Sequence, residues 1–240
     1  YERFFIKFVD YHCNLPLIEY DTLKSDMATV VQAALRNNVA HMLGVATDFS
    51  EHQQLCDISE RFDSVRISAG LHPNESMTVT PNRDMLLTLA SHPKVIAIGE
   101  TGLDYYRDPT HQHQSVQTEW FIAHIEVAKK LNKPLIVHTR MAKADTIAVL
   151  KKENAADAGA VLHCFTEDWE MAKQALDLGL YLSFSGIITF KNADDLREVV
   201  KKTPIDRLLI ETDAPFLAPM PFRGKINQPA YVTEVAAAVA

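Results

Sequence analysis

Titratable side chains end several short apolar runs of this sequence, and their types suit metal binding. Imidazole nitrogens and carboxylate oxygens are common ligands of zinc, manganese and magnesium in proteins. The set is larger than the three protein ligands that one catalytic zinc ion normally takes. It therefore predicts a centre for two divalent cations, with Glu100 or Asp213 as the bridging carboxylate. The residues that end the runs are His12, His72, Glu100, His138, His163 and Asp213.

The apolar runs themselves predict a fold that would bring these residues together. Stretches of helical periodicity lie between them, as in Phe121, Ile125 and Ala128, so strands and helices alternate. Eight such units in one domain favour a closed (β/α)8 barrel, in which the carboxyl ends of the strands surround the active site. A doubly wound sheet is the alternative, although no GxGxxG pattern follows the first run. The strands are expected at residues 4–12, 39–47, 65–72, 95–103, 135–140, 160–165, 180–187 and 206–213.

The composition is typical of a globular protein from a reducing compartment. The 240 residues suit one barrel domain, which we expect to cover residues 1–240, with a last helix that continues beyond residue 240. The three cysteines, Cys13, Cys56 and Cys164, form no CxxC pair, which argues against a disulfide framework. No apolar run is long enough to span a membrane. We expect a cytoplasmic monomer without membrane contact.

The formal net charge of −7 bears on the class of substrate. Proteins that bind nucleic acid usually carry a basic face, and no basic cluster here is longer than a Lys-Lys pair. Bound cations can still supply positive charge locally, so an acidic protein can act on phosphate esters. Other chemistries fit poorly, because the sequence has no P-loop, no GxSxG motif and no cysteine placed for thiol catalysis.

Longer motifs carry a resemblance to a known family. They are VDYHCNL, SAGLHP, IGETGLDYY, LNKPLIVHTR, VLHCFTE, SFSGIITFKNA, RLLIETDAPFLAP and RGKINQPA, and they run from the first expected strand to the last helix. In order and content they resemble the motifs of the TatD family of metal-dependent deoxyribonucleases, most closely its YcfH branch. The combination of GETGLDYY, PLIVHTR and ETDAPFLAP is highly specific. The resemblance implies a TIM-like barrel of the metallo-dependent hydrolase type that cleaves phosphodiester bonds of DNA.

The resemblance also implies ligands for two metal ions, which would be Mg, Mn or Zn. One family site combines the two histidines of D-x-H-x-H with a glutamate and an aspartate, and the other combines the same glutamate with two further histidines. Asn14 replaces a histidine, and its amide oxygen would favour Mg or Mn and make that site weaker and more exchangeable. Alternatively, Asn14 turns aside and leaves the position to water. The matching positions are His12, Asn14, Glu100 and Asp213 in the first site, and Glu100, His138 and His163 in the second.

Catalysis would depend on Glu100 and Asp213. Metal binding lowers the pKa of a bound water, and Asp213 is placed to accept the proton of that water. The loops favour an open groove for single strands or strand ends, and hence an exonuclease with an oligonucleotide substrate. The residues expected to contact this substrate are His72, Tyr105, Arg140, Arg223 and Lys225, with Tyr106 as a second ring for base stacking.

Three other functions remain open. An amidohydrolase acting on a C–N or lactone bond would use a similar barrel and ligand set, although such enzymes often bridge their metals with a carboxylated lysine. A metal-binding or partner-binding protein whose catalysis Asn14 has weakened is the second. The third is hydrolysis of another phosphoester, with oligonucleotides cleaved incidentally. Asp10 and Glu211, one layer below His12 and Asp213, either orient a ligand or form a buried structural pair.

Overall fold

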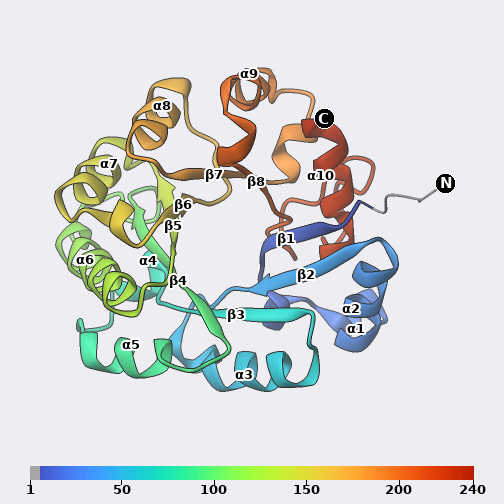
Figure 1. Cartoon of the computed structure of the whole chain (residues 1–240), viewed down its shortest axis with the longest axis horizontal. Helices are drawn as coiled ribbons and strands as arrows, with labels where there is room; N and C mark the ends of the chain where they lie inside the picture. Colours follow the sequence, from blue (N-terminus) through green and yellow to red (C-terminus); the bar gives the residue numbers. More distant parts are fainter. Residues whose placement is uncertain (1–5) are drawn as a thin grey trace.

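Eight parallel strands form a nearly closed barrel in the computed structural model, which describes residues 6–240. The strands follow one another around the ring in sequence order, and a parallel ladder joins each neighbouring pair from β1 to β8. Figure 1 looks down this ring, with the helices outside it. The predicted (β/α)8 barrel is confirmed. The strands are β1 (Phe8–Cys13), β2 (Val39–Gly44), β3 (Val65–Ala69), β4 (Val95–Asp104), β5 (Leu135–Arg140), β6 (Ala160–Leu162), β7 (Tyr181–Phe184) and β8 (Leu208–Ile210).

Most strands are shorter than the apolar runs that predicted them. β3 ends three residues before His72, and β8 ends three residues before Asp213. The chain leaves the ladder near the mouth because its backbone makes other bonds there: the Asp213 amide donates to the carbonyl of His12, and Asp213 has a left-handed φ of 56°. Residues 4 and 5 of the first predicted run lie outside the described part.

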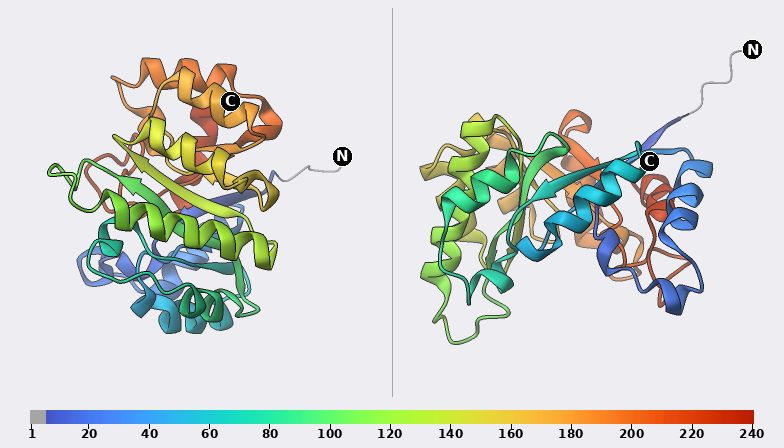
Figure 2. Two further views of the ribbon diagram at one scale, coloured as in Figure 1. Left: turned by 90° about the vertical axis from the view of Figure 1, so that its left-hand side faces the viewer. Right: turned by 90° about the horizontal axis from the view of Figure 1, so that it is seen from below.

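The helices form the outer layer around the barrel, as the two further views show (Figure 2). Within residues 6–240, no helix combines the length and the apolar character needed to cross a membrane. The α-helices are α1 (Tyr20–Leu23), α2 (Met27–Arg36), α3 (His52–Arg61), α4 (Pro73–Ser76), α5 (Arg83–Ala90), α6 (Gln114–Leu131), α7 (Lys143–Lys152), α8 (Trp169–Asp177), α9 (Asp194–Lys202) and α10 (Val232–Val239).

Local sequence signals explain the ends and buried faces of these helices. The 18-residue α6 buries Phe121, Ile125 and Ala128, the face that its periodicity predicted. Asn132 ends this helix with a φ of 51°, a conformation that asparagine tolerates better than most residues. Gly179, with a φ of 78°, separates α8 from β7 and ends the helix in a conformation that glycine adopts easily.

Strands β1 and β8 are joined not by a ladder but by a buried side chain and an isolated backbone bridge. Asp10 of β1 accepts hydrogen bonds from the backbone amide and the hydroxyl of Thr212, which follows β8. Only one isolated bridge, Cys13 with Ala214, pairs the two backbones in the described residues. Asp10 is fully buried, and the bonds from Thr212 compensate part of the cost of burying its carboxyl group. The bonds between Asp10 and Thr212, together with the bridge, hold Asp213 beside His12.

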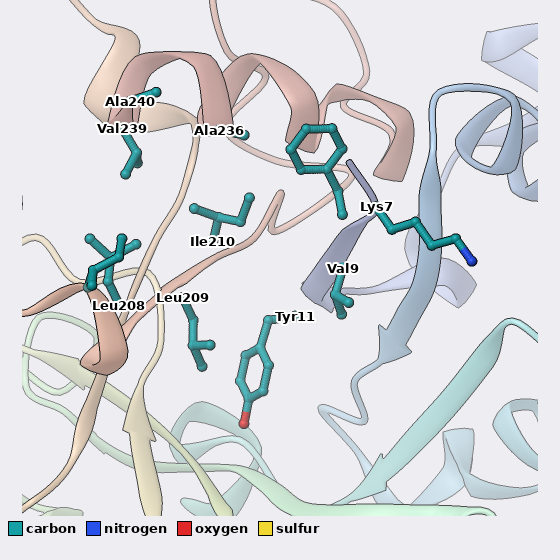
Figure 3. Close-up of a pocket in the computed structure, with 11 residues that line it drawn as sticks. Lys7, Val9, Tyr11, Leu208, Leu209, Ile210, Ala236, Val239 and Ala240 are labelled. Carbon is teal, nitrogen blue, oxygen red and sulfur yellow. The ribbon is translucent and has the colours of Figure 1, made fainter. Parts of the chain in front are cut away.

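An apolar cleft of about 520 Å³ opens where β1 and β8 separate, at their amino-terminal ends. Figure 3 shows this cleft, with α10 beside the two strands. Its lining includes Phe8, Leu209, Ile210 and Val239, with Lys7 at the edge. Because the predicted ligands lie at the carboxyl-terminal ends of the strands, this cleft is at the other end of the barrel.

Candidate metal centre

Glu100 lies at the centre of a cluster of four imidazoles. Its Oε1 is 2.7 Å from His163 Nε2, 3.0 Å from His138 Nδ1 and 3.5 Å from His72 Nε2. Its Oε2 is 3.4 Å from His12 Nε2. These side chains come from β1, β4, β5 and the segments after β3 and β6. The fold therefore brings together the residues that the strand-end pattern singled out.

Two glycines of the GETG motif make room for Glu100. Gly99 and Gly102 have φ values of 139° and 136°, which residues with a Cβ rarely adopt. A Cβ on Gly102 would lie 2.0 Å from the carbonyl oxygen of His138, and one on Gly99 would lie 2.6 Å from that of Ile136. β4 can therefore approach β5 closely only with glycine at both positions, and this approach sets Glu100 beside His138.

The donor atoms fit divalent cations. They form two groups whose members lie within 4.8 Å of one another, one of His12, His163 and Asp213 and the other of His72, Glu100 and His138. His12 is fully buried, and neither of its ring nitrogens has a hydrogen-bond partner among the described residues. A buried imidazole without partners is unfavourable unless another group binds it. A cation beside Nε2 of His12, which lies 3.6 Å from Asp213 Oδ1, would satisfy it.

Two buried carboxylates orient the histidines of β5 and β6. Glu211 Oε1 is 3.1 Å from Nδ1 of His163, and Asp104 Oδ2 is 3.1 Å from Nε2 of His138. Each contact leaves the other ring nitrogen facing Glu100. This arrangement is typical of metal-binding histidines, because the outer carboxylate fixes the ring and makes it a stronger base. For Glu211, it supports ligand orientation, one of the two interpretations left open by the sequence.

Asp104 belongs to this cluster, although the sequence pattern did not single it out. It ends β4, four residues after Glu100 and therefore on the same face of the strand. Its side chain is buried, and its Oδ1 also accepts the backbone amide of Arg107. The signal was present in the motif IGETGLD, whose last letter is a carboxylate at the end of an apolar strand.

Although His72 belongs to the second group of possible metal-binding atoms, its ring is oriented as a hydrogen-bond donor and not as a metal ligand. Its Nδ1 accepts the backbone amide of Asn74, so the proton of the neutral ring lies on Nε2, the atom that faces Glu100. Burial lowers the pKa of His72 to about 4, which keeps the ring neutral at pH 7. Nε2–H can therefore donate to an anionic oxygen bound at the centre.

Helix α6 supports the segment that carries His72. His124 Nε2 accepts the backbone amide of Leu71, and Trp120 Nε1 donates to the carbonyl of Val79. His124 Nδ1 donates in turn to the carbonyl of Trp120. His124 is not among the residues that the sequence pattern singles out, and it fixes the backbone immediately before His72.

The amide of Asn14 faces Asp213 with its nitrogen. Nδ2 lies 3.3 Å from both Asp213 Oδ1 and the carbonyl oxygen of Ala214. The carbonyl can only accept, so it determines which end of the amide is the donor. Oδ1 of Asn14 is buried and has no partner among residues 6–240. Asn14 thus holds Asp213 as a donor, and coordination through Oδ1 remains a prediction.

The two carboxylates of the centre differ in proton affinity. Burial raises the pKa of Glu100, but the neighbouring His163 and His72 outweigh burial and hold it well below its usual range. Burial raises the pKa of Asp213 to about 6, against the opposing effect of His12 and His163. Burial therefore outweighs the neighbouring imidazoles at Asp213, whereas the imidazoles outweigh burial at Glu100.

The predicted substrate contacts lie at the mouth of the barrel, on loops or, for Arg140, at the end of β5. Tyr105 packs against the core, and its hydroxyl donates to Asp145. The neighbouring Tyr106 is 52% exposed, and the guanidinium of Arg140 lies over its ring at 3.7 Å from the centre. Tyr106 is therefore the more accessible of the two tyrosines.

Arg223 and Lys225 lie on the loop between β8 and α10, and both are exposed. The guanidinium carbon of Arg223 is 3.7 Å from the ring centre of Phe190, and the ammonium of Lys225 is 5.7 Å from that of Phe222. Both charged groups therefore lie against aromatic rings at the surface of the protein.

Comparisons with known proteins agree with this geometry. A family model described as "TatD related DNase" matches residues 9–240. The "Uncharacterized metal-dependent hydrolase YcfH" of Escherichia coli (strain K12) is 48% identical over 228 residues, which cover 95% of this chain and 85% of the relative. The "3'-5' ssDNA/RNA exonuclease TatD" of Citrobacter koseri is 35% identical over 224 residues, covering 90% of this chain and 84% of the relative. The crystal structure of YJJV, a TatD homolog from Escherichia coli K12, matches with a TM-score of 0.85 at 26% identity, over 97% of this chain and 88% of that chain.

The barrel and its ring of histidines and carboxylates define a metal-dependent hydrolase of the TIM-barrel type. The chain belongs to the TatD family, as the motifs predicted.

Proposed function

We propose that this protein hydrolyses phosphodiester bonds of single-stranded DNA, from a strand end, with two divalent cations. The observation that carries the proposal is the convergence of four imidazoles on Glu100, with Asp213 next to His12. A relative that is 35% identical is named as an exonuclease of single-stranded DNA and RNA, which supports the class of substrate. Mg, Mn and Zn are all compatible with this mixture of nitrogen and oxygen donors.

The ligands divide between two cations that share Glu100. His12, Glu100 and Asp213, with Asn14 beside them, would hold one, and Glu100 with His138 and His163 would hold the other. When bound, the cations would neutralise the phosphate, polarise its oxygen and lower the pKa of the attacking water. They would also supply the positive charge that a protein with a net charge of −7 lacks.

The side chains of this protein accept a proton from the water and orient the DNA strand. Asp213 accepts the proton of the attacking water, a role that its position 3.6 Å from His12 Nε2, at the edge of the centre, supports. His72 donates a hydrogen bond from Nε2–H to a non-bridging phosphate oxygen and keeps its proton. Arg140, Arg223 and Lys225, with His72, Tyr105 and Tyr106, contact the phosphates and bases of the strand, where the cationic residues set its position.

The test is hydrolysis of end-labelled single-stranded DNA in Mg²⁺ or Mn²⁺. We expect shortening of the strand from one end, loss of activity in EDTA, and a loss of about 10³-fold or more in Glu100→Gln, since this change removes the shared ligand. Glu198→Gln is the matched control, because Glu198 is an exposed residue of α9 that pairs with Lys201.

Other outcomes would redirect the assignment. Parallel assays use duplex DNA, RNA, a small phosphodiester and a cyclic amide. Turnover of the cyclic amide without cleavage of any nucleic acid would replace a nuclease with an amidohydrolase. A folded protein that binds metal and turns over none of these substrates would contradict the proposal and favour a binding function.

A further inference from the structure

Two aromatic rings at the mouth of the barrel are exposed although the fold leaves their backbones little freedom. Among residues 6–240, the large apolar side chains with high exposure include the two aromatic residues Tyr106, at 52%, and Phe216, at 53%. A phenylalanine ring left in water forgoes a stabilisation of roughly 1.5–3 kcal/mol that burial would give it. Because both rings lie on loops at the mouth, after β4 and β8, we infer that they contact a ligand bound there.

Phe216 is presented by a rigid turn next to the metal centre. Its amide donates to the carbonyl of Asp213, and the buried side chain of Asn227 donates to the carbonyls of both Thr212 and Phe216. The ring thus faces solvent three residues from Asp213 while its backbone is held on both sides. Loss of mobility on binding is small for such a ring, which favours affinity.

Tyr106 is presented in a comparable way on another loop. It follows Asp104, which contacts His138, and its ring is covered on one face by the guanidinium of Arg140. The preceding Tyr105 anchors this loop in the core through its ring and its bond to Asp145. Tyr106 therefore stands as an exposed platform beside the ligands of β4 and β5.

The two platforms lie on opposite sides of the centre. In a ring of eight strands in sequence order, β4 is opposite β8, as Figure 1 shows. Such a barrel is about 15 Å across, given strands about 4.8 Å apart and a tilt of about 36°. Glu100 and the histidines lie between the two loops. A single-stranded nucleic acid that contacts both rings must therefore cross the metal centre and extend over more than one nucleotide.

We propose that Tyr106 and Phe216 are stacking platforms for two nucleobases on either side of the phosphodiester that is cleaved. The proposal rests on the nuclease function proposed above and assigns its specificity to polynucleotides with splayed bases. Aromatic rings stack on any base, so they select for a single strand without selecting a sequence. Bases of a duplex are paired and stacked on one another, and they are not available to the two rings. Met141, on the loop after β5, and Met220, on the loop after β8, are also exposed and add adaptable apolar surface.

The test compares two oligomers of equal length and charge, an oligothymidylate and its abasic counterpart, which lacks only the bases. Fluorescence anisotropy measures the dissociation constant of each for the full chain in Ca²⁺. Base stacking on one ring corresponds to about 5- to 150-fold in affinity. We expect Phe216→Ala and Tyr106→Ala each to weaken binding of the oligothymidylate within this range and to change binding of the abasic oligomer less than twofold.

Matched variants separate stacking from simple apolar contact. Phe216→Trp should retain the affinity for oligothymidylate, whereas Phe216→Leu should lose most of what Phe216→Ala loses. Met85→Ala removes an exposed apolar side chain of α5 and should change neither dissociation constant. Thermal unfolding of each variant checks that the fold is intact.

The outcomes distinguish this proposal from the proposed function. Equal weakening of both oligomers by Phe216→Ala would mean that the residue only supports the Asp213 turn, and would overturn the stacking role. Cleavage of DNA by the unaltered chain together with unchanged affinity in both alanine variants would overturn it while leaving the nuclease assignment in place. Failure of the unaltered chain to bind or cleave either oligomer would overturn both.

Discussion

His12 and His163 lie face to face in the metal centre, with ring centroids 4.0 Å apart, yet the structure holds them differently. His163 is fixed by Glu211, as His138 is fixed by Asp104. His12 has no hydrogen-bond partner at either ring nitrogen among the described residues, and the neighbouring Asn14 turns its amide nitrogen to Asp213. We call His138 and His163 the β5–β6 wall, and His12 and Asn14 the β1 wall.

The difference between the two walls indicates how cation binding is divided. A ligand whose orientation is fixed in advance loses little freedom on binding, so the subsite of Glu100 and the β5–β6 wall is prepared for a cation. The subsite at the β1 wall is completed only when a cation binds His12. We therefore expect one tightly held cation and one that exchanges readily. Three experiments test this comparison and its structural support.

The largest expected effect concerns the support behind His72, which borders the β5–β6 wall. Burial lowers the pKa of His124 from 6.5 to about 4, so folding favours the neutral ring. The stabilisation is fully present above pH 6.5 and is lost as the pH falls towards 4, by about 3 kcal/mol for a shift of this size. Urea unfolding between pH 8 and 4 measures it. His124→Gln should remove this part of the acid dependence, and the exposed His41→Gln should not.

If the free energy of unfolding of His124→Gln falls with pH as steeply as that of the unaltered chain, groups other than His124 cause the pH dependence. The support of the His72 segment by α6 would then have to be tested separately, through the exchange protection of the Leu71 amide that His124 binds.

The next effect concerns the carboxylates behind the β5–β6 wall. Glu211→Gln and Asp104→Asn should each weaken the tightly bound cation about 10- to 100-fold, because each removes the charge that orients an imidazole and raises its basicity. Calorimetric titration of the metal-free protein with Mn²⁺ measures this affinity. Asp145→Asn is the control, since Asp145 binds the hydroxyl of Tyr105 and no imidazole. Unchanged affinity in both variants would mean that the β5–β6 wall is not prepared by these contacts.

The smallest effect concerns the β1 wall. Asn14→His should strengthen the exchangeable cation on the order of tenfold and shift the preference towards zinc, because an imidazole replaces an amide. The number of cations retained per chain after gel filtration, measured by metal analysis, should rise from about one towards two. If the variant retains no more metal than the unaltered chain, the comparison between the walls is wrong. Asn14 would then be neither a ligand position nor the cause of weak binding.

The sequence by itself determined the barrel and the residues at its mouth. Apolar runs separated by helical periodicity predict eight strand–helix units, and this alternation does not depend on long-range detail. A titratable residue after an apolar run must then lie at the carboxyl end of a strand, where the barrel gathers such residues. The glycines of GETG also have a local cause, since only glycine adopts their backbone conformations easily.

Only the tertiary structure decided what each polar atom faces. The role of Asp104 depends on its distance to His138, on the neighbouring strand, and that of Asp10 depends on Thr212, about two hundred positions away. The orientation of the Asn14 amide depends on the carbonyl of Ala214. Such contacts join neighbouring strands that are far apart in the sequence or on separate units, and a hydrogen bond is made or lost by differences in distance of a few tenths of an ångström. Periodicity and residue type place a side chain at the mouth, whereas the packed barrel selects its partner.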